Sequence, residues 1–184
     1  MPLVGCFIAV GLAATLRAAD SPKMFATRID IPERGEVPGY LFVVGTNKFS
    51  FIAPQGWKPE GKVERREVVF IAPDLDASLT LKILGSTNSM TAKEVRESLE
   101  QRFPNARLLN EFNCHGATQS GWGFDLEQVA AEKARVRIRL GVVPLPDGVA
   151  EVVLRAPAAR IGDLYFVFGR FLASFQVEGH RPRS

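Results

Sequence analysis

Hydrophobic and polar residues alternate through most of the chain, and this period of two predicts short β-strands. Turn residues separate the runs, and Gly45-Thr46-Asn47 predicts a hairpin with a three-residue loop. Strands joined by such short connections form an antiparallel meander. The predicted strands are residues 40–44, 48–53, 67–72, 78–84, 107–115, 122–129, 134–143 and 149–156.

One segment between these strands has the period of an α-helix. Its start, TAKE at residues 91–94, is a capping box, in which the Thr91 hydroxyl and the Glu94 carboxylate each bond a backbone amide. The helix is predicted to continue to about Phe103 and to pack by one apolar stripe. That stripe is Val95, Leu99 and Phe103.

A second helix is predicted to begin at Ala156-Pro157, because proline suits the first turn of a helix. Large apolar residues then recur at helical spacing, which predicts deep burial. They are Ile161, Leu164, Tyr165, Phe168, Phe171, Leu172 and Phe175. Together the elements predict an α+β fold, with a central antiparallel sheet of about six to seven strands flanked by helices.

The ends of the chain differ from this regular part. Residues 1–18 are read as a signal peptide, because Leu3–Leu16 is apolar and uncharged. This stretch is too short for a membrane span, which needs about 20 residues. We therefore expect an exported protein, periplasmic or extracellular. The less favoured alternative is a lipoprotein anchored through Cys6 in the stretch LVGC.

The remaining boundaries follow from composition. Residues 19–39 contain three prolines and little periodicity, which predicts an extended arm or linker, although Ile29 and Ile31 could form an edge strand. Residues 40–176 are predicted to form a single domain, followed by a polar tail at 177–184. A chain of 184 residues with 46% hydrophobic content is long enough for one real core.

Charge and cysteine content exclude several classes of protein. The formal net charge of +3 falls to +2 without Arg17, so no nucleic-acid partner is expected. Without the signal peptide, Cys114 is the one remaining cysteine and no intramolecular disulfide can form. His115 and His180 are the two histidines, so no histidine-rich metal site is expected.

No cofactor is expected either. The pair of glycines in Gly121-Trp122-Gly123 lacks the third glycine of a dinucleotide-binding loop, since Leu126 stands in its place. These glycines are read as relief for a strand start or for a close backbone approach. Cys114 and His115 are adjacent on a predicted strand, where successive side chains point to opposite faces, so they are not expected to form a catalytic pair.

The order of these elements resembles the PsbP-like family. The segments that carry the resemblance are FSFIAPQGW, TAKEVRESL, RVRIRLGVVPLPDGVAEVVLRAP and the helix end FLASF, within residues 40–175. That family is similar in fold to a eukaryotic Ran-binding nucleotide-release factor and to exported bacterial proteins of unassigned role. The resemblance implies a central antiparallel sheet flanked by helices and no shared catalytic set.

The most suggestive polar pattern is Arg135, Arg137 and Arg139, which share one face of a predicted strand. Such a row could bind a carboxylate, a phosphate or an anionic lipid head group. The favoured interpretation is a cross-strand salt ladder. The carboxylates available for that ladder are Asp125, Glu127 and Glu151.

Trp57 and Trp122 complete the candidate binding residues. Trp57 follows a strand stop at Pro54 and a turn at Gly56, so it is read as closing one end of the core, with ligand stacking as the alternative. The sequence therefore predicts an exported, non-enzymatic binding or accessory protein with an unidentified protein or envelope partner. Its alternatives are a carrier of an anionic small molecule or lipid, and a hydrolase that uses Asp125 and Glu127.

Overall fold

The structure is a computed structural model that describes residues 22–31, 35–62, 66–85, 91–117, 119–129 and 134–178. The predicted signal peptide, Cys6 and His180 lie outside these residues. Two α-helices and one short 3-10 helix (Pro73–Leu75) are present among the described residues, and none is long and apolar enough to cross a membrane.

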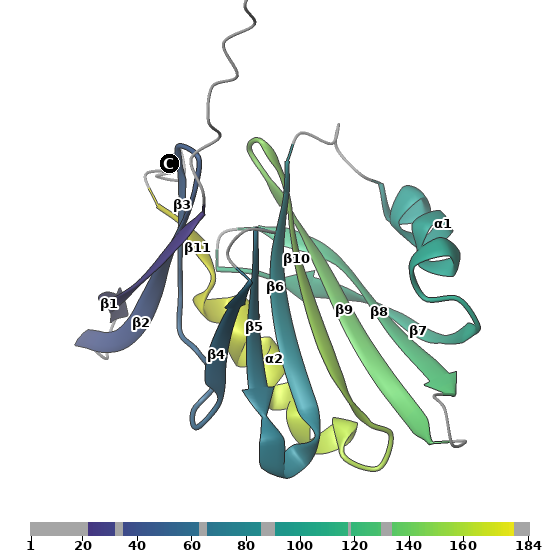
Figure 1. The fold of residues 1–184 in the computed structure, drawn as a ribbon. Coiled ribbons are helices and arrows are strands. Elements are labelled where there is room, and N and C mark those ends of the chain that lie inside the picture. The colour runs from purple at the N-terminus through teal and green to yellow at the C-terminus, as the bar shows by residue number, and fades with distance from the viewer. Residues whose placement is uncertain are drawn as a thin grey trace, which may run out of the picture.

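A seven-stranded antiparallel sheet forms the centre of the molecule (Figure 1). Its strand order is β4-β5-β6-β10-β9-β8-β7. The α+β prediction and the sheet of up to seven strands are confirmed. The strands are β4 (Lys58–Lys62), β5 (Glu67–Ala72), β6 (Ala77–Gly85), β7 (Ala106–His115), β8 (Ser120–Val129), β9 (Arg135–Leu145) and β10 (Gly148–Pro157).

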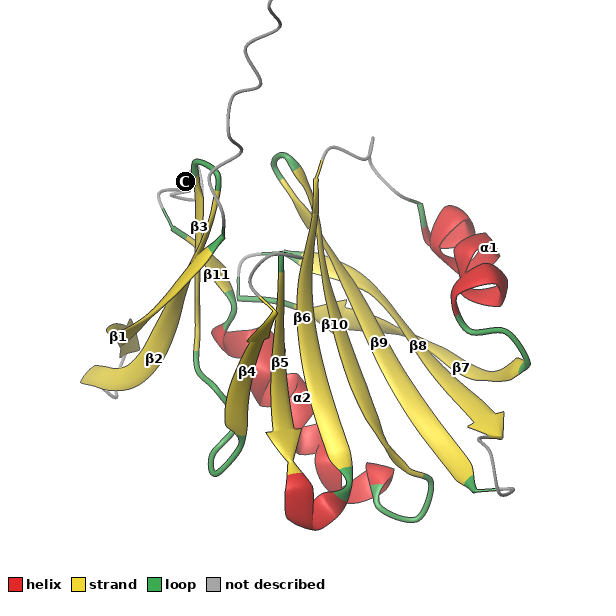
Figure 2. Cartoon of the chain, viewed as in Figure 1, coloured by secondary structure: helices red, strands yellow, loops and turns green. Residues whose placement is uncertain are grey.

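A second sheet contains four strands in the order β1-β2-β3-β11 and lies beside the first (Figure 2). Its strands are β1 (Lys23–Ile31), β2 (Gly35–Val44), β3 (Asn47–Phe51) and β11 (Gln176–Val177). The hairpin loop between β2 and β3 has two residues rather than three, because Val44 pairs with Asn47. Gly45 has a φ of 62°, which the first central position of such a tight turn favours.

The predicted arm at residues 19–39 is wrong for its described part, which forms β1 and the first half of β2. All nine residues of β1 pair with β2, so the edge strand allowed by Ile29 and Ile31 is present. Pro38 is tolerated because β3 pairs only with 40–44 of β2, which leaves Pro38 with a neighbouring strand on one side. The start of the predicted tail at 177–184 also differs, since Val177 pairs with Phe49 of β3.

Helix α1 (Ala92–Arg102) begins at the predicted capping box. The Thr91 Oγ1 accepts a hydrogen bond from the Glu94 amide at 3.3 Å, and the Glu94 carboxylate accepts one from the Thr91 amide at 2.6 Å. Val95 and Leu99 are buried against one face of the seven-stranded sheet, together with Ile138 and other apolar residues of β8 and β9. The predicted apolar stripe therefore anchors α1 to the sheet.

Helix α2 (Ile161–Ser174) covers the opposite face of the seven-stranded sheet (Figure 1). It begins later than predicted, because Pro157 still pairs with Val136 at the end of β10. A proline φ suits a strand end as well as a helix start, so sequence alone did not separate the two. The predicted burial is confirmed for Ile161, Leu164, Phe168, Phe171, Leu172 and Phe175.

A cluster of phenylalanines joins α2 to both sheets. The Phe51 ring of β3 lies 5.3 Å from the Phe171 ring of α2 and 5.9 Å from the Phe70 ring of β5, measured between centroids. Phe49 of β3 stacks on Phe175 at 5.7 Å, immediately after α2. The core therefore continues from the seven-stranded sheet through α2 into the four-stranded sheet.

Candidate functional site

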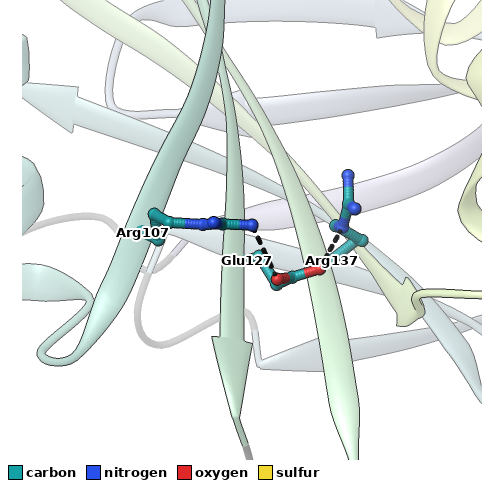
Figure 3. A network of polar contacts seen from close by, with 3 residues as sticks. All are labelled: Arg107, Glu127 and Arg137. Atoms are coloured by element: carbon teal, nitrogen blue, oxygen red, sulfur yellow. Dashed lines mark hydrogen bonds and ion pairs between the residues drawn. The ribbon is translucent and has the colours of Figure 1, made fainter.

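The candidate arginine row follows β9 on the sheet face that α2 covers. The antiparallel register places Asp125 opposite Arg139 and Glu127 opposite Arg137. The Arg137 Nε lies 2.9 Å from Glu127 Oε2, while the Arg107 Nη2 on β7 lies 3.2 Å from Oε1 of the same carboxylate (Figure 3). The cross-strand ladder that the sequence allowed is thus present for Arg137 and Arg139.

The arginines also set the ionisation of Glu127. Burial of its carboxyl group acts to raise the pKa, but the hydrogen bond from Arg137 and the charges of Arg137, Arg135 and Arg107 outweigh it. The pKa of Glu127 is therefore lowered below its ordinary value. A carboxylate held in this way stays ionised at neutral pH and does not serve as a general acid.

Arg139 is the most enclosed member of the row. Its Nε and Nη2 atoms donate to the two Asp125 oxygens at 2.8 and 2.9 Å, and the two side chains are 16% and 9% exposed. The centre of its guanidinium group also lies 3.5 Å from the Tyr165 ring centroid and 4.3 Å from that of Phe112. Arg139 therefore ties β8 and β9 to α2, and little of it remains for a ligand.

Two glycines make room for the rings around Arg139. A β-carbon on Gly123 would overlap the Phe112 ring, and one on Gly141 would lie 2.9 Å from Cζ of Phe168. The close backbone approach expected at this pair of glycines is found at Gly121, where a β-carbon would overlap the Val142 carbonyl oxygen. At Gly123 the close neighbour is instead an aromatic side chain of the adjacent strand β7.

Trp57 lines a separate groove between the β3–β4 loop, the N-terminal hairpin and α2. We call it the Trp57 groove. Its volume is about 640 Å³, within the range of about 300–1,000 Å³ typical of small-molecule sites. The lining residues are mostly apolar: Ile31, Val37, Pro38, Ile52, Ala53, Pro54, Gln55, Trp57, Phe166, Val167, Arg170 and Phe171.

The sequence around Trp57 explains its position. Gly56 has a φ of 80°, and the Trp57 amide donates to the Pro54 carbonyl at 3.1 Å, which turns the chain back after β3. The Trp57 ring packs against the core yet is only partly buried. It therefore closes the core, as predicted, and presents its remaining surface to the groove.

Comparison with known proteins gives similarity of structure alone. No protein-family profile and no curated protein matches the chain. The LpqN protein of Mycobacterium tuberculosis, involved in cell envelope biogenesis, matches with a TM-score of 0.55 at 11% identity, over 84% of this chain and 91% of that one. The Ran-binding protein Mog1p of Saccharomyces cerevisiae matches with a TM-score of 0.52 at 14% identity, over 84% and 96%.

The cyanobacterial PsbP of Synechocystis matches over 95% of this chain and 98% of its own, with a TM-score of 0.50 at 15% identity. The chain has the PsbP-like fold. At such identities the likeness extends to the fold and not to a ligand or a partner.

The PsbP-like fold separates the five candidate binding residues. Trp57 lies at the groove, and Arg137 and Arg139 lie over β9 on the α2 face. Trp122 packs on the opposite sheet face, with the core beneath α1. Arg135 is exposed at the start of β9. These residues therefore do not form one site.

The PsbP-like sheet also separates the remaining polar candidates. Cys114 is buried and the pKa of its thiol is raised, chiefly by burial, while His115 is exposed and its Nδ1 lies 3.0 Å from Ser120 Oγ. They lie on opposite faces, as predicted. Glu151 does not join the arginine row, because it faces α1 and pairs there with Arg102.

Phe166 and Arg170 are the site residues that sequence reasoning missed. They lie one turn apart on α2, outside the buried stripe of the helix. The signal was a large aromatic residue at a position where the helical period predicts a polar one. Phe166 is 68% exposed, and its position in the lining of the Trp57 groove is what makes it a site residue.

Proposed function

We propose that this chain is an exported, non-enzymatic binding protein that takes a small apolar ligand in the Trp57 groove. The observation that carries the proposal is an apolar groove of about 640 Å³ with the exposed Phe166 ring at its edge. Concave apolar surfaces with few polar groups are the usual form of small-molecule sites. Trp57 gives the groove a rigid aromatic wall.

Two features support a binding role without catalysis. Asp125 forms an ion pair with Arg139, and Glu127 forms ion pairs with Arg107 and Arg137. These carboxylates therefore connect neighbouring strands of the sheet. Cys114 and His115 point to opposite faces and do not activate each other.

Export is supported by the apolar, uncharged stretch at Leu3–Leu16, which has the length of a signal-peptide core. The M. tuberculosis neighbour with this fold is a protein of cell envelope biogenesis. An exported protein with this groove would meet its ligand in the envelope or outside the cell.

The arginine row supports a second candidate, a carrier of an anionic small molecule, through its exposed member. Arg135 and Arg155 line a hollow of about 360 Å³ that also contains Asp76. Phosphate binding to the wild type that is lost in Arg135→Gln would favour this candidate over the groove.

The groove is tested with phenylnaphthylamine, a neutral apolar dye that fluoresces on binding. We expect the dye to bind the wild-type protein and Phe166→Asp to weaken it about tenfold, because the variant places a charge at the apolar edge. Ala173→Asp is the matched control, since Ala173 is exposed on the same helix and does not line the groove. Equal dye affinity of the wild type and Phe166→Asp would contradict the proposal.

A further inference from the structure

Arg170 is the one charged residue among the described residues that line the Trp57 groove. It lies on α2 four residues after Phe166, and the centre of its guanidinium group is 5.2 Å from the Phe166 ring centroid. Residues four apart face the same side of a helix, so the ring supports the charge at the groove edge. A positive charge thus stands beside an apolar cavity.

The contrast with Arg139 shows what Arg170 lacks. Arg139 has aromatic rings against its guanidinium plane and a carboxylate bound along its edge, with two hydrogen bonds to Asp125. Arg170 has the aromatic ring, but no carboxylate of the described residues lies within 4.0 Å of it. The planar guanidinium fork binds a carboxylate through two parallel hydrogen bonds. The exposed guanidinium group of Arg170 therefore has room for a carboxylate from outside the chain.

We propose that the Trp57 groove binds a single-chain amphipathic carboxylate, whose alkyl chain lies against Trp57 and whose carboxylate pairs with Arg170. This inference rests on the proposed function, because it assumes that the groove is the binding site. It adds the chemical class of the ligand: a monocarboxylate with a medium to long alkyl chain, in the manner of a fatty acid.

The distribution of charge favours a free ligand over a membrane surface. Proteins that bind anionic bilayers present clusters of about four to eight basic residues. Among the described residues that line the groove, Arg170 is the one basic residue, and the others are apolar or uncharged. A single arginine at the edge of an apolar groove matches one head group on one chain.

The ligand class is tested by fluorescence of Trp57 in a Trp122→Phe background, in which Trp57 is the one tryptophan. Trp122 lies on the opposite face of the sheet, so its replacement leaves the groove intact. The probes are decanoate, octanoate and decanol, each as a monomer in solution. We expect decanoate to bind more tightly than decanol, which lacks the carboxylate. We also expect decanoate to bind more tightly than octanoate, by about fourfold for each of its two additional methylene groups.

Arg170→Gln is expected to weaken decanoate binding about tenfold and to leave decanol binding unchanged, because only the charge-assisted hydrogen bonds are lost. Arg160→Gln is the matched control, since Arg160 is exposed at the start of the same helix and does not line the groove. This control is expected to bind decanoate like the wild type.

The outcomes separate this inference from the proposed function. Equal binding of decanoate and decanol, unaffected by Arg170→Gln, would overturn the anionic ligand while the groove remains the site. Absence of binding by every alkyl probe and by the neutral dye would overturn both proposals. Binding to phosphatidylglycerol vesicles without binding to decanoate would assign the groove edge to a membrane surface and overturn the free carboxylate.

Discussion

At the scale of single residues, Arg139 and Arg170 show how the same side chain serves two purposes. Both guanidinium groups lie against an aromatic ring. Arg139 is 16% exposed and bound to Asp125, so its charge is satisfied inside the protein. Arg170 is exposed and lines a groove. Burial and the position of the nearest carboxylate therefore distinguish a structural arginine from a candidate binding one.

The structural role of Arg139 predicts a large cost for removing its partner. Asp125→Asn is expected to lower the free energy of unfolding by about 3 kcal/mol, because it leaves a largely buried guanidinium group without its counter-charge. Urea denaturation at pH 7 measures this value. The loss is expected to appear without a change in dye binding, since Asp125 lies outside the Trp57 groove.

Arg107→Gln provides the comparison. Arg107 pairs with Glu127 but its side chain is 72% exposed, so we expect its removal to cost less than about 1 kcal/mol. If Asp125→Asn costs no more than Arg107→Gln, Arg139 is not the anchor between β8, β9 and α2.

The sequence predicted the pairing of these residues better than their surroundings. Alternation places Asp125 and Glu127 on one face of β8 and the arginines on one face of β9, so a ladder was foreseeable. The rings of Phe112 and Tyr165, which lie against Arg139, come from β7 and α2. The alternation within one strand does not predict which aromatic residues of other elements pack against it. For the same reason the sequence did not assemble the Trp57 groove, whose walls come from three parts of the chain.

At the scale of elements, local signals decide which boundaries are predictable. The capping box fixed the start of α1 because Thr91 and Glu94 satisfy backbone amides within one turn. No such bond caps α2, and its start was placed too early. The edge strands β4 and β11 were missed, since they are short and pair on one side only. Alternation is weak in strands that do not cover a core.

The capping box predicts a pH dependence of α1. Hydrogen bonds from the Thr91 amide and the Thr91 hydroxyl lower the pKa of Glu94 below its ordinary value of 4.5. A carboxyl whose pKa is lower in the folded state contributes stability above the unfolded pKa and loses it as the pH falls through the folded pKa. The stability difference between wild type and Glu94→Gln is therefore expected to be constant from pH 7 to about pH 5 and to vanish in more acidic solution.

Urea titrations of the two proteins between pH 7 and pH 3 measure this difference. Glu100→Gln is the control, because Glu100 is exposed on the same helix and lies outside the capping box. A stability difference for Glu94→Gln that stays unchanged down to pH 3 would show that the ionised carboxylate does not cap the helix.

At the scale of the whole molecule, the question is whether the two sheets are one folding unit. They do not share a strand, and β11 joins the four-stranded sheet only after the chain has passed through α2. The Phe51 ring lies between Phe70 of the large sheet and Phe171 of α2, so the apolar core is continuous across both sheets. A continuous core predicts cooperative unfolding of the whole described domain.

Two tryptophans report on different parts of this core. Trp57 lies between the sheets and Trp122 lies beneath α1 on the far face of the large sheet. The variants Trp122→Phe and Trp57→Phe each contain a single tryptophan, whose fluorescence is followed during urea unfolding. In each variant we expect the fluorescence transition to coincide with the loss of secondary structure measured by circular dichroism on the same protein. An earlier transition at Trp57 would mean that the four-stranded sheet opens on its own.

Phe51→Ala tests the physical cause of that cooperativity. Removing a fully buried phenylalanine costs about 3–5 kcal/mol, and here the cavity would lie where the two sheets and α2 meet. We expect the Trp57 transition to move to lower urea than the Trp122 transition once this ring is absent. Phe25→Ala is the control, because Phe25 is about half exposed on the edge strand β1 and its loss should leave both transitions together. If the transitions stay together in Phe51→Ala as well, the sheets are held by contacts other than this ring, with Phe49 and Phe175 as the next pair to remove.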